Sequence, residues 1–231
     1  MTGAPPGFFG KLRSHGDFVG RRLPPAMREP FDAWLQAALL HSQRDLGAAW
    51  LPVWLNSPLW RFVLAPGVCG EQAWSGVMMP SVDRVGRCFP LVLAAPSAGA
   101  PALAACMTQH DVWFAQLEDI ALSSLEEGFA LDAFDAALLA LAGAPPANAA
   151  AADGPPVHVA QVAALAAGAL PNLAGAALDG ASAWWGTGSA QVAPSLAICP
   201  GLPAPASFAA MLDGSWRARD WQATWNLMPD P

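Results

Sequence analysis

Tyrosine is absent from this sequence, and charged residues make up only 13% of its 231 residues. Apolar residues make up 54%, which argues against a disordered chain because they supply enough surface for a sizeable core. The net charge of −7 argues against a general nucleic-acid binder, since phosphate contacts need clustered lysine and arginine. Residues 1–90 carry nine basic and six acidic side chains, whereas residues 91–231 carry two and twelve. We therefore expect a basic patch in the N-terminal part.

Several common sequence motifs are also missing. The four cysteines form no C-x-x-C pair, which excludes the usual zinc-ribbon and redox spacings and predicts free buried thiols: Cys69, Cys88, Cys106 and Cys199. There is no H-E-x-x-H motif or paired carboxylate cluster, so we expect no catalytic metal and no cofactor. The N-terminus lacks the apolar core of a signal peptide. Prolines and glycines interrupt the uncharged windows at residues 88–110 and 154–178, so we expect no transmembrane helix.

Short apolar runs bounded by glycine and proline indicate β-strands. They lie at residues 7–12, 18–23, 60–65, 74–79 and 89–95. A helix is expected to begin at Glu29-Pro30, because proline is tolerated in the first turn, and to end near Gly47. Residues 49–56 are expected to form a packed connector. Short connections between the last three strands favour antiparallel pairing.

Further helices are expected from a Thr108 cap to Gly128 and over residues 129–141. In the first we expect Val112 and Leu125 to face inward, and in the second we expect Asp132 and Asp135 to face away from the core. The order strand–strand–helix–strand–strand–strand–helix predicts an α/β protein of the α+β type, with a central antiparallel sheet flanked by helices. Profilin-like and longin-like modules share this order.

The C-terminal part begins with a stretch rich in alanine and proline. We expect three regions: a sheet core at 1–142, a linker or loop at 143–156, and an α/β extension at 157–231 that packs on the same domain. The extension is expected to hold an alanine-rich helix at 157–168, strands at 181–185 and 195–199, and a helix at 207–212. A strand through Trp184-Trp185 puts one indole on each face, so one of the pair is a candidate contact residue.

The loop at residues 81–87 is the most polar segment between the predicted strands. Its arginines can bind an acidic group or phosphate of a partner, or an internal ion pair of Asp83 with Arg61, Arg84 or Arg87 can fix the turn. Both alternatives remain open. The candidate contact or site-shaping residues are Lys11, Asp17, Arg21, Asp83, Arg84, Arg87 and Trp184.

Two other segments resemble catalytic or phosphate-binding motifs. Ser14, His15 and Asp17 are residue types of a catalytic triad, but a triad needs groups that converge from separate places, so a hairpin turn is favoured. The glycine-rich residues 186–189 follow a predicted strand as a phosphate loop does. They lack the GK[ST] ending, which favours a tight turn.

Taken together, several stretches resemble the TagF family of type VI secretion-associated proteins: GFFGKLRSHGDFVGRRLP, FDAWLQ, SPLWRFVLAPGVCG, AWSGVMMPSVDRVGRCFPLVLAA, WWGTGS and FAAMLDGSW. The family pattern usually reads KLPSHGDF, and this chain has Arg13 in place of the proline. The resemblance implies a cytoplasmic bacterial accessory protein that represses type VI secretion post-translationally. It also implies action through a forkhead-associated scaffold protein of the threonine-phosphorylation pathway.

Three hypotheses follow. The first is a non-enzymatic regulator that binds another secretion-system protein. The second is a hydrolase or phosphate-binding enzyme that uses Ser14, His15 and Asp17 or the Arg84 and Arg87 loop. It predicts that Ser14 and His15 lie in one pocket, within hydrogen-bond reach of each other. The third is a peripheral partner of the inner membrane.

Overall fold

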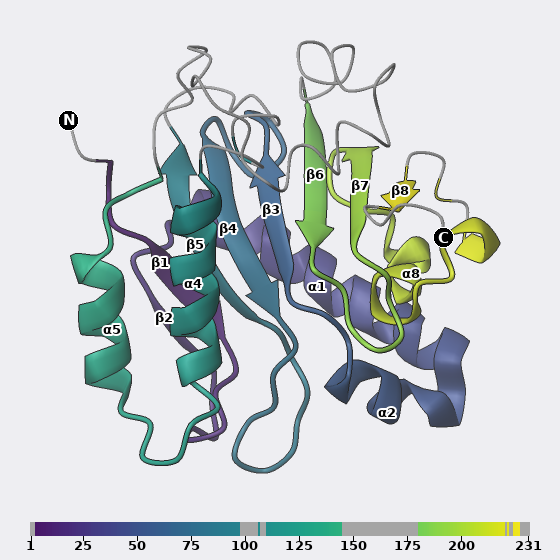
Figure 1. The fold of residues 1–231 in the computed structure, drawn as a ribbon, viewed down its shortest axis with the longest axis horizontal. Helices are drawn as coiled ribbons and strands as arrows, with labels where there is room; N and C mark the ends of the chain where they lie inside the picture. Colours follow the sequence, from purple (N-terminus) through teal and green to yellow (C-terminus); the bar gives the residue numbers. More distant parts are fainter. Residues whose placement is uncertain are drawn as a thin grey trace.

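The structure is a computed structural model that describes residues 3–97, 106, 110–144, 180–219, 221 and 224–226. Its centre is an eight-stranded antiparallel sheet with the order β2-β1-β5-β4-β3-β6-β7-β8 (Figure 1). The strands are β1 (Gly7–Gly10), β2 (Val19–Arg21), β3 (Trp60–Leu64), β4 (Ala73–Met79), β5 (Leu91–Ser97), β6 (Ala181–Gly186), β7 (Ser195–Pro200) and β8 (Thr224–Asn226). This confirms the predicted class, an antiparallel sheet flanked by helices.

Helices cover both faces of the sheet (Figure 1). One face carries α4 (Asp111–Ser123) and α5 (Leu131–Ala140), and the other carries α1 (Pro25–Leu46), α2 (Trp50–Leu55) and α8 (Ala209–Asp213). Alternate strand residues therefore enter different cores. The ring centroids of Phe8 and Phe134 of α5 lie 5.1 Å apart, whereas those of its neighbour Phe9 and Phe31 of α1 lie 6.1 Å apart.

The α1–α2 region differs from the sequence prediction at two points. The first helix begins at Pro25, not at Glu29-Pro30, because Pro25 supplies the pre-set first turn and the Pro24 carbonyl accepts the first amide bonds. It ends before Gly47, as predicted. The predicted connector is a 3₁₀ turn (Gly47–Ala49) followed by α2. Trp50 and Trp54 stack at 5.5 Å along α2, at the i, i+4 spacing of one helix face.

Three side chains in or next to α4 and α5 also correct the prediction. Val112 is 70% exposed and Leu125 is 41% exposed, so neither faces the core. The helix ends at Ser123, which leaves Leu125 in the following turn before Gly128, and it begins at Asp111, while Thr108 lies outside the described residues. Asp135 is 7% exposed instead of facing solvent, because it pairs with Arg21 at the end of β2 and with Arg22 just after it.

Strands β6 and β7 match the two C-terminal strands that the sequence predicts. β6 pairs with β3, with Phe62 opposite Trp184, so the sheet continues directly from the N-terminal strands. The predicted last helix is a 3₁₀ turn (Pro205–Ser207) followed by α8. The expected linker from residue 145 onward and the expected helix at 157–168 lie outside the described residues.

Candidate functional site

Two turns lie together at one end of the sheet, the β1–β2 turn and the β4–β5 loop (Figure 1). The hydroxyl of Ser81 donates to the Lys11 carbonyl at 2.8 Å, and the amide of Arg84 donates to the His15 carbonyl at 2.9 Å. The guanidinium of Arg87 donates to the Gly16 carbonyl. The structure therefore brings most of the predicted site residues into one surface.

Asp83 is the buried centre of this surface, with a side chain that is 0% exposed. Its carboxylate accepts from Lys11 Nζ at 2.8 Å, from the Val85 amide at 3.0 Å, and from the Arg87 amide and Nε at 2.9 and 2.6 Å. Gly86 closes the turn with a φ of +86°, a conformation that glycine adopts without steric cost. The loop is therefore held in one shape by a single carboxylate.

Burial opposes the charge of Asp83, but the bonds from Lys11, Arg87 and Val85 outweigh it and hold its pKa well below the usual range. The carboxylate thus stays ionised, and both of its oxygens accept hydrogen bonds from within the protein. Of the internal pairs that the sequence allowed, Asp83 with Arg87 is present. The pair with Lys11 was not anticipated, because Lys11 lies 72 residues away in sequence.

Outside this buried pair, several side chains of the two turns face solvent. Arg84 is exposed, Val85 is 67% exposed and the side chain of Arg87 is 59% exposed. Phe18 is 55% exposed although its ring packs at 4.8 Å from Phe89 and lies 4.4 Å from Lys11 Nζ. Within the part of the chain that the structure describes, no carboxylate pairs with Arg84. Arginine and aromatic side chains in such positions are typical of protein-binding hot spots.

Arg21 lies apart from this surface. It is 39% exposed and pairs with Asp135 at 2.6 Å and with Asp132 at 3.2 Å, while Arg22 pairs with Asp135 at 2.5 Å. Burial opposes the charge of Asp135, but the bonds from Arg21 and Arg22 lower its pKa from the usual value. These arginines fix α5 to the edge strand β2.

Trp184 is the clearest correction among the candidate contact residues. It is 0% exposed, and its neighbour Trp185 is 4% exposed. The prediction that one indole faces solvent assumed a sheet with one open face, whereas helices cover both faces here. Trp184 packs at 5.4 Å from Trp34 and 5.1 Å from Phe62, so it is a core residue.

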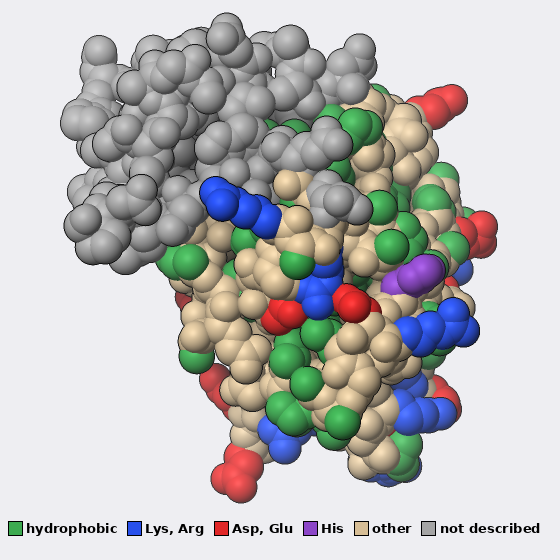
Figure 2. Space-filling model, turned by 90° about the vertical axis from the view of Figure 1, so that its right-hand side faces the viewer, with side chains coloured by type: hydrophobic (Ala, Val, Ile, Leu, Met, Phe, Trp, Pro, Cys, Tyr) green, Lys and Arg blue, Asp and Glu red, His purple; other side chains and the backbone are tan. Residues whose placement is uncertain are grey.

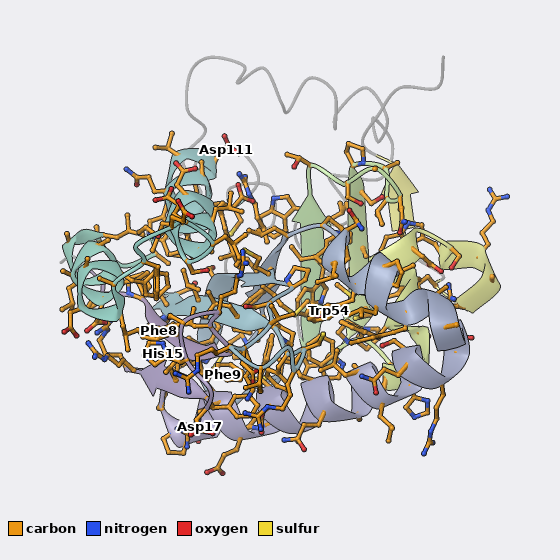
Figure 3. The ribbon with its side chains drawn as sticks, turned by 90° about the horizontal axis from the view of Figure 1, so that it is seen from below. Phe8, Phe9, His15, Asp17, Trp54 and Asp111 are labelled. Atoms are coloured by element: carbon orange, nitrogen blue, oxygen red, sulfur yellow. The ribbon has the colours of Figure 1, made fainter. Side chains whose placement is uncertain are left out.

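The Ser14, His15 and Asp17 group does not form a catalytic triad. Ser14 Oγ lies 2.8 Å from His15 Nδ1, so the pair is within hydrogen-bond reach, but on an exposed turn. The Asp17 side chain is fully exposed, and its carboxylate lies 3.9 Å from the Arg87 guanidinium. Figure 3 shows Asp17 and His15 on the same side of the molecule. A triad needs the carboxylate on Nδ1 to orient the imidazole, and here the serine occupies that nitrogen.

The other sequence motifs have structural roles where the structure describes them. The Ser189 hydroxyl accepts from the amides of Gln191 and Val192, which makes the glycine-rich segment a closed turn. All four cysteines are free, as predicted, but only Cys69 and Cys106 are buried, whereas Cys88 and Cys199 are partly exposed. Burial raises the pKa of the Cys69 and Cys106 thiols to about 12. Among the described residues there is no His, Cys, Asp and Glu group suited to a metal ion, and no helix long and apolar enough to span a membrane.

A groove beside Phe18 was not anticipated. Its volume is about 390 Å³, and it lies between the β1–β2 region and the start of α1, lined by Phe9, Phe18, Val19, Gly20, Arg28, Glu29, Asp32 and Gln36. Glu29, Asp32 and Gln36 follow the i, i+3, i+7 spacing of one helix face, which was the available signal in the sequence. That spacing marks a polar face but does not reveal which strand lies opposite it.

The edge of the sheet at β8 shows a different surface. Figure 2, which views the molecule from the β8 side, shows basic and acidic side chains interspersed over the described part of that face. Arg219 pairs there with Asp45 at 2.6 Å and with Asp213 at 2.9 Å. Arg219 is therefore neutralised, unlike Arg84, whereas the neighbouring Arg217 is exposed and has no ion pair among the described residues.

Comparisons with known proteins identify the family of this chain. A model of the TagF N-terminal domain, described as type VI secretion system-associated, matches residues 7–141. The chain belongs to the TagF family. The match includes both turns of the candidate site and the strands β1 to β5. This TagF chain is therefore a type VI secretion-associated protein, as the sequence resemblance implied.

One solved structure resembles this TagF chain over almost its whole length. It is the crystal structure of PA0076 from Pseudomonas aeruginosa PAO1, with 41% sequence identity and a TM-score of 0.76. The likeness covers 91% of this chain and 94% of that one. No curated protein matches.

Proposed function

We propose that this TagF protein is a non-enzymatic, cytoplasmic regulator that represses type VI secretion post-translationally by binding another protein of the system. The proposed partner is a forkhead-associated scaffold protein. The observation that carries the proposal is the surface of the two turns, where the buried Asp83 fixes a loop that exposes Arg84 and Val85 beside Phe18. A fixed loop loses little entropy on binding, which favours recognition.

The chemistry of this surface favours binding over catalysis. Its buried acid is consumed by internal bonds, so it is not poised to accept or release a proton near neutral pH. Apart from Asp17, its exposed members discussed above are arginine, phenylalanine and valine, which suit contact with a partner. The exposed Ser14 and His15 pair lacks the orienting carboxylate that would activate the hydroxyl.

A pull-down with purified scaffold protein tests the proposal, using Arg84→Ala and Arg87→Ala. We expect both variants to bind less scaffold protein. The melting temperature should stay close to that of the unchanged protein in Arg84→Ala and should fall in Arg87→Ala, because Arg87 Nε bonds the buried Asp83 carboxylate at 2.6 Å. Arg44→Ala is the matched control, since Arg44 is an exposed arginine in the last turn of α1. Full binding by both site variants would remove this surface from the interface. Failure of the unchanged protein to bind the scaffold would remove that partner.

A further inference from the structure

We propose that the surface formed by Phe18, Arg84 and Val85, here called the Arg84 surface, binds a partner segment in which a single carboxylate adjoins an apolar side chain. This proposal rests on the proposed function and specifies the chemistry of the partner. It assigns the carboxylate to Arg84, with Arg87 beside it, and the apolar side chain to Phe18 and Val85.

Arg84 provides the charge that the carboxylate needs. No carboxylate of the described chain pairs with it, which is also true of Arg13, Arg28, Arg44 and Arg217. Arg84 differs from these four because it lies in the loop that the buried Asp83 fixes. Its amide is fixed by the His15 carbonyl at 2.9 Å, which holds its backbone against the β1–β2 turn. A guanidinium presented in this way matches the two oxygens of a carboxylate.

The neighbouring acidic residues limit the partner to one carboxylate. Asp17 lies 3.9 Å from Arg87 and is fully exposed. Glu29 and Asp32 line the groove that also contains Phe18. Glu126 and Glu127 line a separate hollow that contains Arg13 and Ser14 of the β1–β2 turn. A run of acidic residues would meet like charges at these places, which is a costly mismatch.

Phe18 and Val85 provide the apolar part. Their exposed fractions of 55% and 67% are high for such side chains, and each lies within two residues of a backbone group that joins the two turns. The Phe18 ring is held by Phe89 and by the Lys11 ammonium, so it is an ordered contact surface before binding. An ordered aromatic ring contributes contact area at low entropic cost.

The same charges argue against a membrane or nucleic acid as the ligand. Recognition of anionic lipid by charge requires clusters of about four to eight basic residues. Here four exposed arginines do not form a cluster, because carboxylates outnumber them in the same region of a chain with a net charge of −7. The arginines are Arg13, Arg28, Arg84 and Arg87, and the carboxylates are those of Asp17, Glu29, Asp32, Glu126 and Glu127. A protein segment with one carboxylate fits this arrangement better than a polyanion does.

Site-specific photo-cross-linking tests the proposal. A photo-reactive p-benzoylphenylalanine replaces Val85 in the full chain, and the purified scaffold protein of the proposed function is the probe. Mass spectrometry then identifies the cross-linked segment. The control carries the same group at Val112, which is 70% exposed at the start of α4. We expect the photo-reactive group at position 85 to cross-link one segment of the scaffold protein that has Asp or Glu next to an apolar residue. The same group at position 112 should not cross-link that segment.

A charge swap then tests the assigned contact. Arg84→Glu should weaken scaffold binding by more than about tenfold. Lysine in place of the carboxylate in the cross-linked segment should restore affinity to within about threefold, because the two residues are coupled. A cross-linked segment without a carboxylate, or a swap without rescue, overturns the proposal.

The remaining outcomes separate the two proposals. If the unchanged chain binds the scaffold but Val85 gives no cross-link, the Arg84 surface is wrong and the proposed function stands. If no complex forms, the scaffold partner is wrong and this proposal falls with it. Flotation with phosphatidylserine vesicles gives the third outcome. Vesicle binding that Arg84→Glu abolishes would mean that the surface recognises lipid.

Discussion

Two buried ion-pair clusters in this protein contain similar residue types but have different structural roles. In the Arg61 cluster, Arg61 of β3 binds Glu118 of α4 through two bonds of 2.7 and 2.8 Å and Asp111 at 2.6 Å. In the Asp83 cluster, the buried member is the acid, and it binds Lys11, Arg87 and two backbone amides. The first joins a helix to the sheet, whereas the second shapes a loop.

The two clusters differ in which group has all its hydrogen bonds inside the protein: the guanidinium of Arg61 in one and the carboxylate of Asp83 in the other. All three guanidinium nitrogens of Arg61 are bonded and its side chain is 9% exposed. Burial opposes its charge, but Glu118 and Asp111 outweigh this and raise its pKa. The Asp83 cluster instead leaves Arg84 outside, in a backbone position that the cluster defines. The buried charge of Arg61 thus stabilises the packing of α4 on the sheet, whereas the buried charge of Asp83 fixes the loop that exposes Arg84.

The Arg61 cluster should give the largest effect on stability. Arg61→Met leaves Glu118 and Asp111 without their cation against the sheet, so the free energy of unfolding should fall by about 3 kcal/mol. Urea denaturation at neutral pH measures it. Scaffold binding by the folded fraction should stay unchanged, because the Arg84 surface is built on other residues. A loss of binding without a loss of stability would reverse the comparison.

The Asp83 cluster should affect binding through the shape of the loop. Asp83→Asn removes the charge that Lys11 and Arg87 share, so the loop loses its fixed form and scaffold affinity should fall by about tenfold. Titration calorimetry measures the change. Asp45→Asn is the control, since its ion pair with Arg219 at 2.6 Å lies on the surface at the β8 end. Unchanged affinity in Asp83→Asn would show that the loop needs no such anchor.

The sequence predicts the strands well because their signal is local. Short apolar runs between glycine and proline locate β3, β4 and β5 to within two residues. The α2 helix is missed because Pro52 interrupts its pattern, although proline is tolerated in a first turn. The burial of Trp184 is missed because alternation along a strand identifies two faces but not whether helices cover both.

The candidate site is predictable only in part for the same reason. The polarity of residues 81–87 marks the loop, and a near-neighbour pair such as Asp83 with Arg87 is visible in the sequence. The partners that give the site its form, Lys11 and Phe18, lie more than 60 residues away. They come together only through the pairing of β1 with β5, which no local pattern specifies.

Acid should weaken the Asp83 cluster and the ion pairs of Asp135 with Arg21 and Arg22. The pKa values of Asp83 and Asp135 are lowered in the folded protein, so each contributes stability above its unfolded pKa of about 4. That contribution is lost as the pH falls from about 4 towards the folded pKa. We expect the melting temperature to drop over this range and the slope to be shallower in Asp83→Asn. Equal slopes in both proteins would mean that Asp83 binds its proton equally when folded and unfolded.

Asp17 should give the smallest effect and one of opposite sign. It lies 3.9 Å from Arg87, is fully exposed and competes with a partner carboxylate for the same positive surface. Asp17→Asn should therefore strengthen scaffold binding by about twofold, with the gain shrinking as salt screens the exposed charge. Stability should not change, because the long contact to Arg87 is solvated. Weaker binding in Asp17→Asn would instead place Asp17 in direct contact with a basic group of the partner. The surface would then bind both an acidic and a basic group of that partner.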